Sequence, residues 1–162
     1  MKRFIALYFL YLVLLFTFFY ADTSIVSTFL NDGQTKLTLY ALSIFLDPGQ
    51  LKGIDIWITP HYKIIINQAC NGMIPLLLLW ASLLAYPSGW IHKLFWMGIG
   101  YFIFSFANIL RILLVVHFVT QKGGQENFYW SHDFLGNALL IFVGLGIFIS
   151  YIKTSNTPLP QQ

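Results

Sequence analysis

The sequence predicts an all-α integral membrane protein, and three observations carry that prediction. Of its 162 residues, 57% are hydrophobic and only 9% are charged, and the mean hydropathy is +0.70. This composition lies outside the soluble globular range and inside the range of membrane proteins. Aromatic residues, 19% of the chain, suit lipid contact and interfacial belts. The net charge of +3 comes from too few residues to form a basic face, so nucleic acid is not an expected partner.

Apolar segments predict about four transmembrane helices in a single membrane domain, residues 1–153. A span requires about 20 apolar residues. The predicted spans are Phe4–Ala21, Met73–Tyr86, Leu94–Val119 and Phe134–Ile152. The first follows a basic start, but its apolar run is too long for a signal peptide and lacks a clear cleavage site, so we expect a retained span. The tail 154–162, with two prolines, is expected to be disordered.

The long outer connection 22–72 contains two further predicted elements. The apolar run Leu37–Leu46 has about 10 residues, which is too short to cross the bilayer, and we expect an interfacial or re-entrant helix there. On either side of Pro60, the runs Gly53–Ile58 and Tyr62–Ile66 cluster β-branched and aromatic residues, a pattern typical of a β-hairpin. The second strand of this hairpin leads the chain into the second span.

Basic residues in the short connections predict the orientation, because these charges resist translocation. Lys2 and Arg3 precede the first span, Lys93 lies in the short turn after the second, and Lys153 follows the fourth. The opposite side carries about as many lysines, but in long connections, so the short ones decide. Both termini are therefore expected in the cytoplasm.

The only cysteine lies in a short polar break directly before the second predicted span. Pro75 suits the first turn of a helix, so this span is expected to begin near Met73, with Cys70 in the turn before it. A helix N-terminus and a nearby cation can lower the pKa of a thiol from about 8.5 to about 7 or less, which makes a nucleophile. The alternative is a small apolar filler. A single cysteine excludes an intramolecular disulfide and a multi-thiolate zinc site.

Arg111 is the only charged residue between Leu94 and Val116, and an arginine at mid-span costs roughly 2.5–3.5 kcal/mol. At about 1.5 Å per residue from Lys93, it lies roughly 27 Å along the helix, near the outer edge of a core about 30 Å thick. Asn108 lies on the same helical face, so the two residues form a polar patch that should face the bundle interior. The alternative is an arginine that snorkels at the end of its span.

Four histidines compete for an acid–base role. His92 lies in the predicted inner turn and His61 at the tip of the hairpin, where interfacial and solvated roles are expected. His117 lies six residues beyond the arginine, which rotates it about 120° off that face. His132 begins the fourth span, with Ser131 as a possible N-cap, and a helix N-terminus favours a neutral imidazole. His132 is therefore the predicted acid–base residue, with His117 in reserve.

Cys70, Arg111 and His132 are thus predicted to converge on one membrane face. They supply a nucleophile, a cation for a developing oxyanion and a general acid–base group, the minimum for acyl transfer at a thiol. The segments Ala69–Met73 (ACNGM) and Asn108–Ile112 (NILRI), with His132 leading into the last span, resemble the Cys, Arg and His signature of the exosortase/archaeosortase family. The resemblance covers roughly residues 64–152. The small size and the Cys-Asn-Gly form are similar to the compact exosortase H type.

The resemblance implies a sortase-like membrane cysteine transpeptidase or protease. Cys70 would attack a backbone carbonyl in the C-terminal sorting signal of an exported protein, form a thioester and release the tail. His132 would activate the thiol and protonate the leaving amine, while Arg111 would stabilise the oxyanion. The acyl group would pass to an amine acceptor or to water, without a metal or cofactor. The expected supporting residues are Asn71, Gly72 and Asn108.

The resemblance also implies the partners and the location. The substrate's sorting signal would combine a short motif, a transmembrane helix and a basic cluster. The enzyme would lie in the bacterial cytoplasmic (inner) membrane, with its active site at the extracytoplasmic face. Many relatives are longer, so self-association or a membrane partner is expected. Two alternatives stay open: a non-catalytic scaffold or transporter subunit in which Arg111 pairs with a partner's carboxylate, and an intramembrane peptidase that cleaves without transfer.

Overall fold

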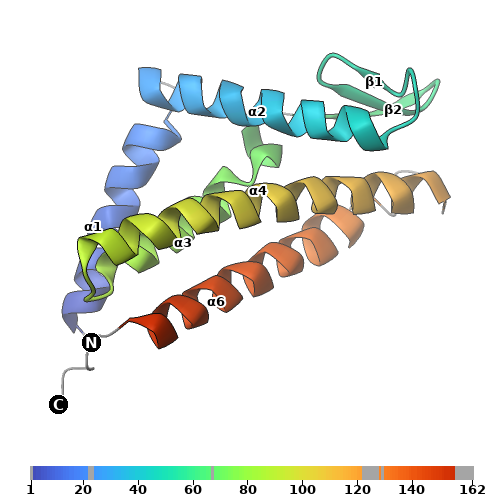
Figure 1. The fold of residues 1–162 in the computed structure, drawn as a ribbon. Coiled ribbons are helices and arrows are strands. Elements are labelled where there is room, and N and C mark those ends of the chain that lie inside the picture. The colour runs from blue at the N-terminus through green and yellow to red at the C-terminus, as the bar shows by residue number, and fades with distance from the viewer. Residues whose placement is uncertain (1, 22–23, 67, 122–127, 129, 156–162) are drawn as a thin grey trace.

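The computed structural model describes residues 2–21, 24–66, 68–121, 128 and 130–155 of the chain. The fold is mostly helical (Figure 1), as the sequence predicts. Its α-helices are α1 (Lys2–Phe19), α2 (Ile25–Phe45), α3 (Met73–Ala85), α4 (Trp90–Gln121) and α6 (Asn137–Thr154). A short 3-10 helix, η1 (Gln68–Asn71), precedes α3, and a π-helical segment, η2 (Trp130–Gly136), precedes α6.

Among the described residues, three helical segments are long and apolar enough to cross a membrane: Lys2–Phe19, Trp90–Gln121 and Phe134–Thr154. The predicted count of four spans is not confirmed, because α3 has only 13 residues. Its length of about 20 Å is less than the roughly 30 Å of a hydrocarbon core. Helix α3 lies at the centre of the bundle: it packs against α1, α4 and α6, and Leu77, Ala81 and Leu83 are fully buried.

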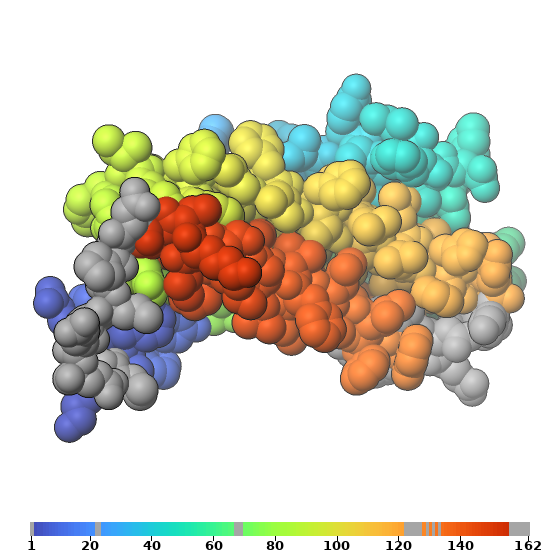
Figure 2. All heavy atoms as spheres, turned by 60° about the horizontal axis from the view of Figure 1, so that its bottom comes forward, coloured from blue at the N-terminus to red at the C-terminus, as the bar shows by residue number. Residues whose placement is uncertain are grey.

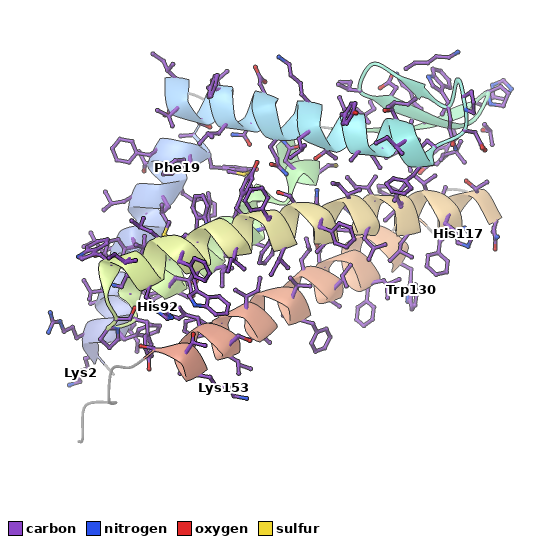
Figure 3. All side chains as sticks on the ribbon, viewed as in Figure 1. Lys2, Phe19, His92, His117, Trp130 and Lys153 are labelled. Carbon is purple, nitrogen blue, oxygen red and sulfur yellow. The ribbon has the colours of Figure 1, made fainter. Side chains whose placement is uncertain are left out.

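Different side chains mark the two ends of the bundle. Lys2, His92 and Lys153 lie at one end, whereas His117 and Trp130 lie at the other (Figure 3). Helix α6 lies along α4, and the space-filling view shows the two together on one face, with α2 behind them (Figure 2). Lys93, which the sequence places in a turn, instead lies in the first turn of α4, where its Nζ donates to the Leu84 carbonyl at 2.6 Å.

The predicted short helix Leu37–Leu46 is in fact the second half of α2, which has 21 residues. Ser24 caps its N-terminus, accepting from the backbone N–H of Ser27 at 3.4 Å. The prediction stopped at the apolar run because polar residues interrupt the preceding two turns. Two of these polar residues, Asn31 and Gln34, lie on the buried face of the helix, so the interruption marks a contact with the bundle and not the end of the helix.

The buried face of α2 is polar and forms hydrogen bonds with α4. Gln34 donates from Nε2 to Ser105 Oγ at 3.1 Å and accepts at Oε1 from the Tyr101 hydroxyl at 2.6 Å. Several outward residues are apolar, including Ile25 and Phe29, which are 87% and 78% exposed. This inside-out pattern is typical of helix packing in lipid, where interhelical hydrogen bonds take over from the hydrophobic effect.

The predicted hairpin is confirmed as β2 (Asp55–Thr59) and β3 (Tyr62–Ile65), and a two-residue strand, β1 (Leu51–Lys52), adds to it in the order β1-β2-β3. One face of the antiparallel sheet buries Ile56 and Ile64 against the ends of α2 and α4. The sheet thereby lies at the C-terminal end of α4 (Figure 1), away from both chain termini. β3 leads through η1 into α3, so the sheet positions the segment that carries the only cysteine.

Candidate active site

Cys70 lies in η1, directly before α3, as the sequence predicts. The residue is partly buried, and its thiol donates to the Ile65 carbonyl with an Sγ···O distance of 3.8 Å. The adjoining N-terminus of α3 supplies the positive end of a helix dipole, which favours a thiolate over a thiol. The position is thus suited to a nucleophile.

Gly72 joins η1 to α3 and fits its position for two reasons. Its φ of 70° lies in the left-handed region that glycine adopts without strain. A Cβ at this position would also lie 3.0 Å from Cγ of Asn108. The close approach lets the fully buried Asn108 donate from Nδ2 to the Cys70 carbonyl at 2.7 Å. Asn108 therefore ties α4 to the backbone of the cysteine.

Arg111 occupies the same buried face of α4 as Asn108, as the helical spacing predicts. It is only 5% exposed, so it does not snorkel toward the end of its helix. Nη1 donates to Asn108 Oδ1 at 3.5 Å, and Nη2 lies 3.0 Å from Nε2 of His132. The guanidinium therefore lies between a residue that holds the Cys70 backbone and an imidazole from another segment.

His132 lies inside η2, so the prediction that it begins a helix beside an N-cap is wrong. The side chain of Ser131 lies outside the described residues. The imidazole stacks on the ring of Phe128, with centroids 5.0 Å apart and an interplanar angle of 13°. Because a guanidinium can only donate hydrogen bonds, Nε2 of His132 accepts from Arg111. A hydrogen bond in this direction requires a neutral imidazole with its proton on Nδ1.

Cys70, Arg111 and His132 line one small pocket. Its cavity volume is about 10 Å³, close to the lower limit for a single water molecule. The remaining lining residues are apolar: Ile64, Ile66, Ile112 and Val115. Apolar walls lower the local dielectric and strengthen any charge interaction inside the pocket. The structure thus brings together the three residues that the sequence singles out.

Gly136 packs against Arg111 and Phe128 against His132, although the sequence analysis did not identify either residue. A Cβ on Gly136 would lie 2.6 Å from Nε of Arg111, so the absence of a side chain lets the arginine pass along η2. Gly136 could have been found in the sequence by its spacing, because it lies four residues, about one helical turn, after His132. Asn71, a predicted supporting residue, turns away from the pocket: its Nδ2 donates to Thr35 Oγ1 at 2.8 Å, which fastens η1 to α2.

The other histidines lie elsewhere. His117 is exposed on α4 and is absent from the residues lining the pocket. His92 lies at the opposite end of the bundle (Figure 3), where its Nε2 is 3.1 Å from Thr154 Oγ1. His61 is exposed in the turn of the hairpin. Among the described residues, His132 alone of the four histidines contributes to the pocket.

A larger hollow, of about 440 Å³, lies on the sheet and is lined by Lys52, Trp57, Ile58, Thr59 and Pro60. It is wide and open, and it includes none of the residues of the small pocket. Within the described part of the chain, no group of three or more His, Cys, Asp or Glu side chains could hold a metal ion. The side chains that line the small pocket include a thiol, an imidazole and a guanidinium.

Comparison with known proteins gives a match at the level of the protein family. No curated protein and no solved structure matches the chain. The family model of the transmembrane exosortases matches residues 1–149, which is most of the chain. With its three apolar helices, the protein is a membrane protein. The chain belongs to the transmembrane exosortase family.

Proposed function

We propose that this protein is a membrane cysteine transpeptidase that cleaves the C-terminal sorting signal of an exported protein. The observation that carries the proposal is the shared pocket of Cys70, Arg111 and His132, in which the guanidinium and imidazole lie 3.0 Å apart. The family membership supports an exosortase-like function in general. The roles of the three residues follow from their chemistry.

Catalysis begins with a change of hydrogen-bond partners. In the observed arrangement Arg111 donates to the Nε2 lone pair of His132, which is the group needed to accept the thiol proton. A guanidinium has five N–H donors and prefers an oxygen that is gaining negative charge. A substrate carbonyl that enters the pocket therefore draws Arg111 toward its oxygen. Nε2 is then released to take the proton of Cys70.

The covalent steps require only the substrate, an amine acceptor and the side chains of the pocket. The Cys70 proton passes to His132, and Sγ forms a bond to the carbonyl carbon while the oxyanion is held by Arg111. The tetrahedral intermediate collapses by breaking the C–N bond, and the imidazolium of His132 protonates the leaving amine. An amine acceptor then attacks the thioester and gives up a proton to His132. The C–S bond breaks as the new C–N bond is formed, and the proton on His132 passes to the sulfur, which regenerates the thiol.

The arrangement supports an active site at the extracytoplasmic side of a bacterial inner membrane, with both termini in the cytoplasm. Lys2 and Lys153 lie at one end of the bundle (Figure 3), and the sheet lies toward the other (Figure 1). Helix α4 has 32 residues and is about 48 Å long, so it extends beyond a core of about 30 Å. The substrate would present its scissile bond just outside its own transmembrane helix.

The scaffold alternative requires Arg111 to pair with a carboxylate of a partner. Arg111 is 5% exposed and bonds to Asn108 and His132 of its own chain, an arrangement that favours the enzyme. A peptidase that releases its product to water would use the same pocket. Transfer and hydrolysis differ only in what attacks the thioester.

Co-expression with a secreted reporter tests the proposal. The reporter carries a C-terminal signal made of a short motif, an apolar helix and a basic cluster, and its size is followed by immunoblotting. We expect the wild type to shorten the reporter, and Cys70→Ala and Cys70→Ser to leave it at full length. Processing by Cys70→Ala would refute the proposal. Mass spectrometry of the new C-terminus separates transfer, which leaves an adduct, from hydrolysis, which leaves a free carboxylate.

A further inference from the structure

The strand that leads to Cys70 is an edge strand. In the part of the chain that the structure describes, β3 pairs with β2 alone, because the sheet has the order β1-β2-β3. An edge strand presents a row of N–H and C=O groups on its outer side, ready to pair with another chain. What the outer edge of β3 could bind depends on which residues face it.

The ladder shows that Lys63 and Ile65 face the outer edge. The N–H of Ile66 donates to the carbonyl of Ile54 at 2.9 Å. Hydrogen-bonded pairs recur at every second residue of an antiparallel ladder, so Ile64 also bonds toward β2. The intervening residues Lys63 and Ile65 therefore direct their backbone groups away from β2.

The outer edge leads directly to the nucleophile. The carbonyl of Ile65 is the group that accepts from the Cys70 thiol, so the sulfur lies beside this edge. The side chain of Lys63 is 40% exposed and Ile65 is 48% exposed, so the surroundings of the edge are open. Ile64 and Ile66 meanwhile line the small pocket from the same segment. A chain lying along the outer edge of β3 would pass Cys70.

We propose that the substrate binds by strand addition: the extended segment just before its transmembrane helix pairs with the outer edge of β3 and brings the scissile carbonyl to Cys70. This inference rests on the proposed function and names how the substrate is held. Strand addition to a sheet edge is a recurring mode of peptide recognition, in which main-chain hydrogen bonds supply affinity for any sequence. Side-chain pockets then supply selectivity.

The direction of the added strand follows from the path of the chain. β3 continues through η1 into α3, so it runs toward the membrane. The substrate segment also runs toward the membrane, because a transmembrane helix follows it. Two neighbouring segments that enter the membrane in the same direction pair as parallel strands. In a parallel ladder Lys63 contributes its N–H and C=O, and Ile65 contributes its N–H.

A matched pair of variants at position 63 tests the inference with the reporter that the wild type processes. Lys63→Pro removes the outward N–H and places a ring at the edge without breaking a bond to β2. Lys63→Ala loses the same side chain, including its 2.6 Å ion pair with Asp55, but keeps the N–H. We expect Lys63→Pro to process the reporter about tenfold more slowly than Lys63→Ala. Labelling of Cys70 by iodoacetamide should be equal in the two variants.

Photo-crosslinking provides a second measurement that does not depend on the folding of the proline variant. In a Cys70→Ala background, p-benzoylphenylalanine replaces Ile65 at the outer edge or Lys52 on β1, at the opposite edge of the sheet. We expect a crosslink to the reporter from position 65 and none from position 52.

The outcomes separate the two proposals. A folded Lys63→Pro variant that processes the reporter as fast as Lys63→Ala would overturn strand addition while leaving the proposed function intact. Equal crosslinking from positions 65 and 52, or none from position 65, would do the same even if Lys63→Pro does not fold. A wild type that leaves the reporter at full length would overturn the proposed function, and this inference with it.

Discussion

Gly136→Ala should disable the pocket by adding one methyl group. The backbone of Gly136 is right-handed helical, with φ of −66° and ψ of −41°, so alanine meets no backbone strain there. Its Cβ would, however, lie 2.6 Å from Nε of Arg111 and 2.9 Å from Cγ. Cβ contacts under 3.0 Å are essentially never observed, and ordinary contacts begin at 3.4 Å. From 2.6 Å, the side chain of Arg111 must therefore move by at least 0.4 Å, and by 0.8 Å to reach an ordinary contact.

A displacement of this size is large for the proposed chemistry. The contact from Arg111 Nη2 to His132 Nε2 is 3.0 Å, and N–H···O-type bonds weaken beyond about 3.2 Å. Misplacement of a catalytic group by about 1 Å can cost about 100-fold in rate. We therefore expect Gly136→Ala to process the reporter about 100-fold more slowly than the wild type.

Gly146→Ala is the matched control. Gly146 lies on α6, and a Cβ there would meet nothing within 4 Å. This variant should process the reporter at the wild-type rate. Equal rates for Gly136→Ala and Gly146→Ala would show that the position of the Arg111 side chain does not limit the reaction, and the role given to its guanidinium would then be wrong.

Three further predictions concern neighbouring residues. Gly72→Ala and Gly53→Ala both place alanine at a positive φ, of 70° and 63°, at a cost of roughly 1–2 kcal/mol. Both variants should therefore lower the melting temperature. Only Gly72→Ala should also lose processing, because only its Cβ would crowd Asn108. Asn108→Ala removes the 2.7 Å bond to the Cys70 carbonyl and should lower processing at least about tenfold, with a loss of stability of about 1–3 kcal/mol measured by thermal unfolding. His132→Ala should abolish processing while His117→Ala leaves it unchanged; the reverse result would move the acid–base role to the exposed face of α4.

The fold could be predicted from the sequence wherever lipid decides the pattern. Helices α1, α4 and α6 coincide with continuous apolar runs, because a span in lipid must be apolar along its length. The first half of α2 was missed because its buried residues, Ser27, Asn31 and Gln34, are polar. Hydropathy alone does not distinguish a polar face turned into a bundle from a polar loop. Hydropathy alone also does not settle the fourth span: α3 is apolar along its length, but it has only 13 residues and is enclosed by other helices.

The site residues could be predicted from the cost of placing polar groups in a membrane. Arg111 attracts attention because a charge inside a span requires partners, and the structure supplies Asn108 and His132. The surroundings of His132 could not be predicted, since a π-helical segment has no simple sequence pattern and its stacking on Phe128 is a tertiary contact. Gly136 was missed because the use of a glycine for close packing depends on which side chain crosses it.

The same close contacts that assemble the bundle also assemble the pocket. Helices in lipid gain little from hydrophobic burial, so their association depends on small residues and interhelical hydrogen bonds. Gly72 admits Asn108, and Gly136 admits Arg111, at positions where any Cβ would be crowded. Away from the pocket, Gly144 admits the ring of Phe104 in the same manner, with a Cβ distance of 3.2 Å. Helix α4 supplies the partner side chain at all three contacts, so a shift of this one helix would open the pocket and loosen the bundle together. The contacts that hold the bundle together are therefore the same ones that hold three separate segments around one thiol.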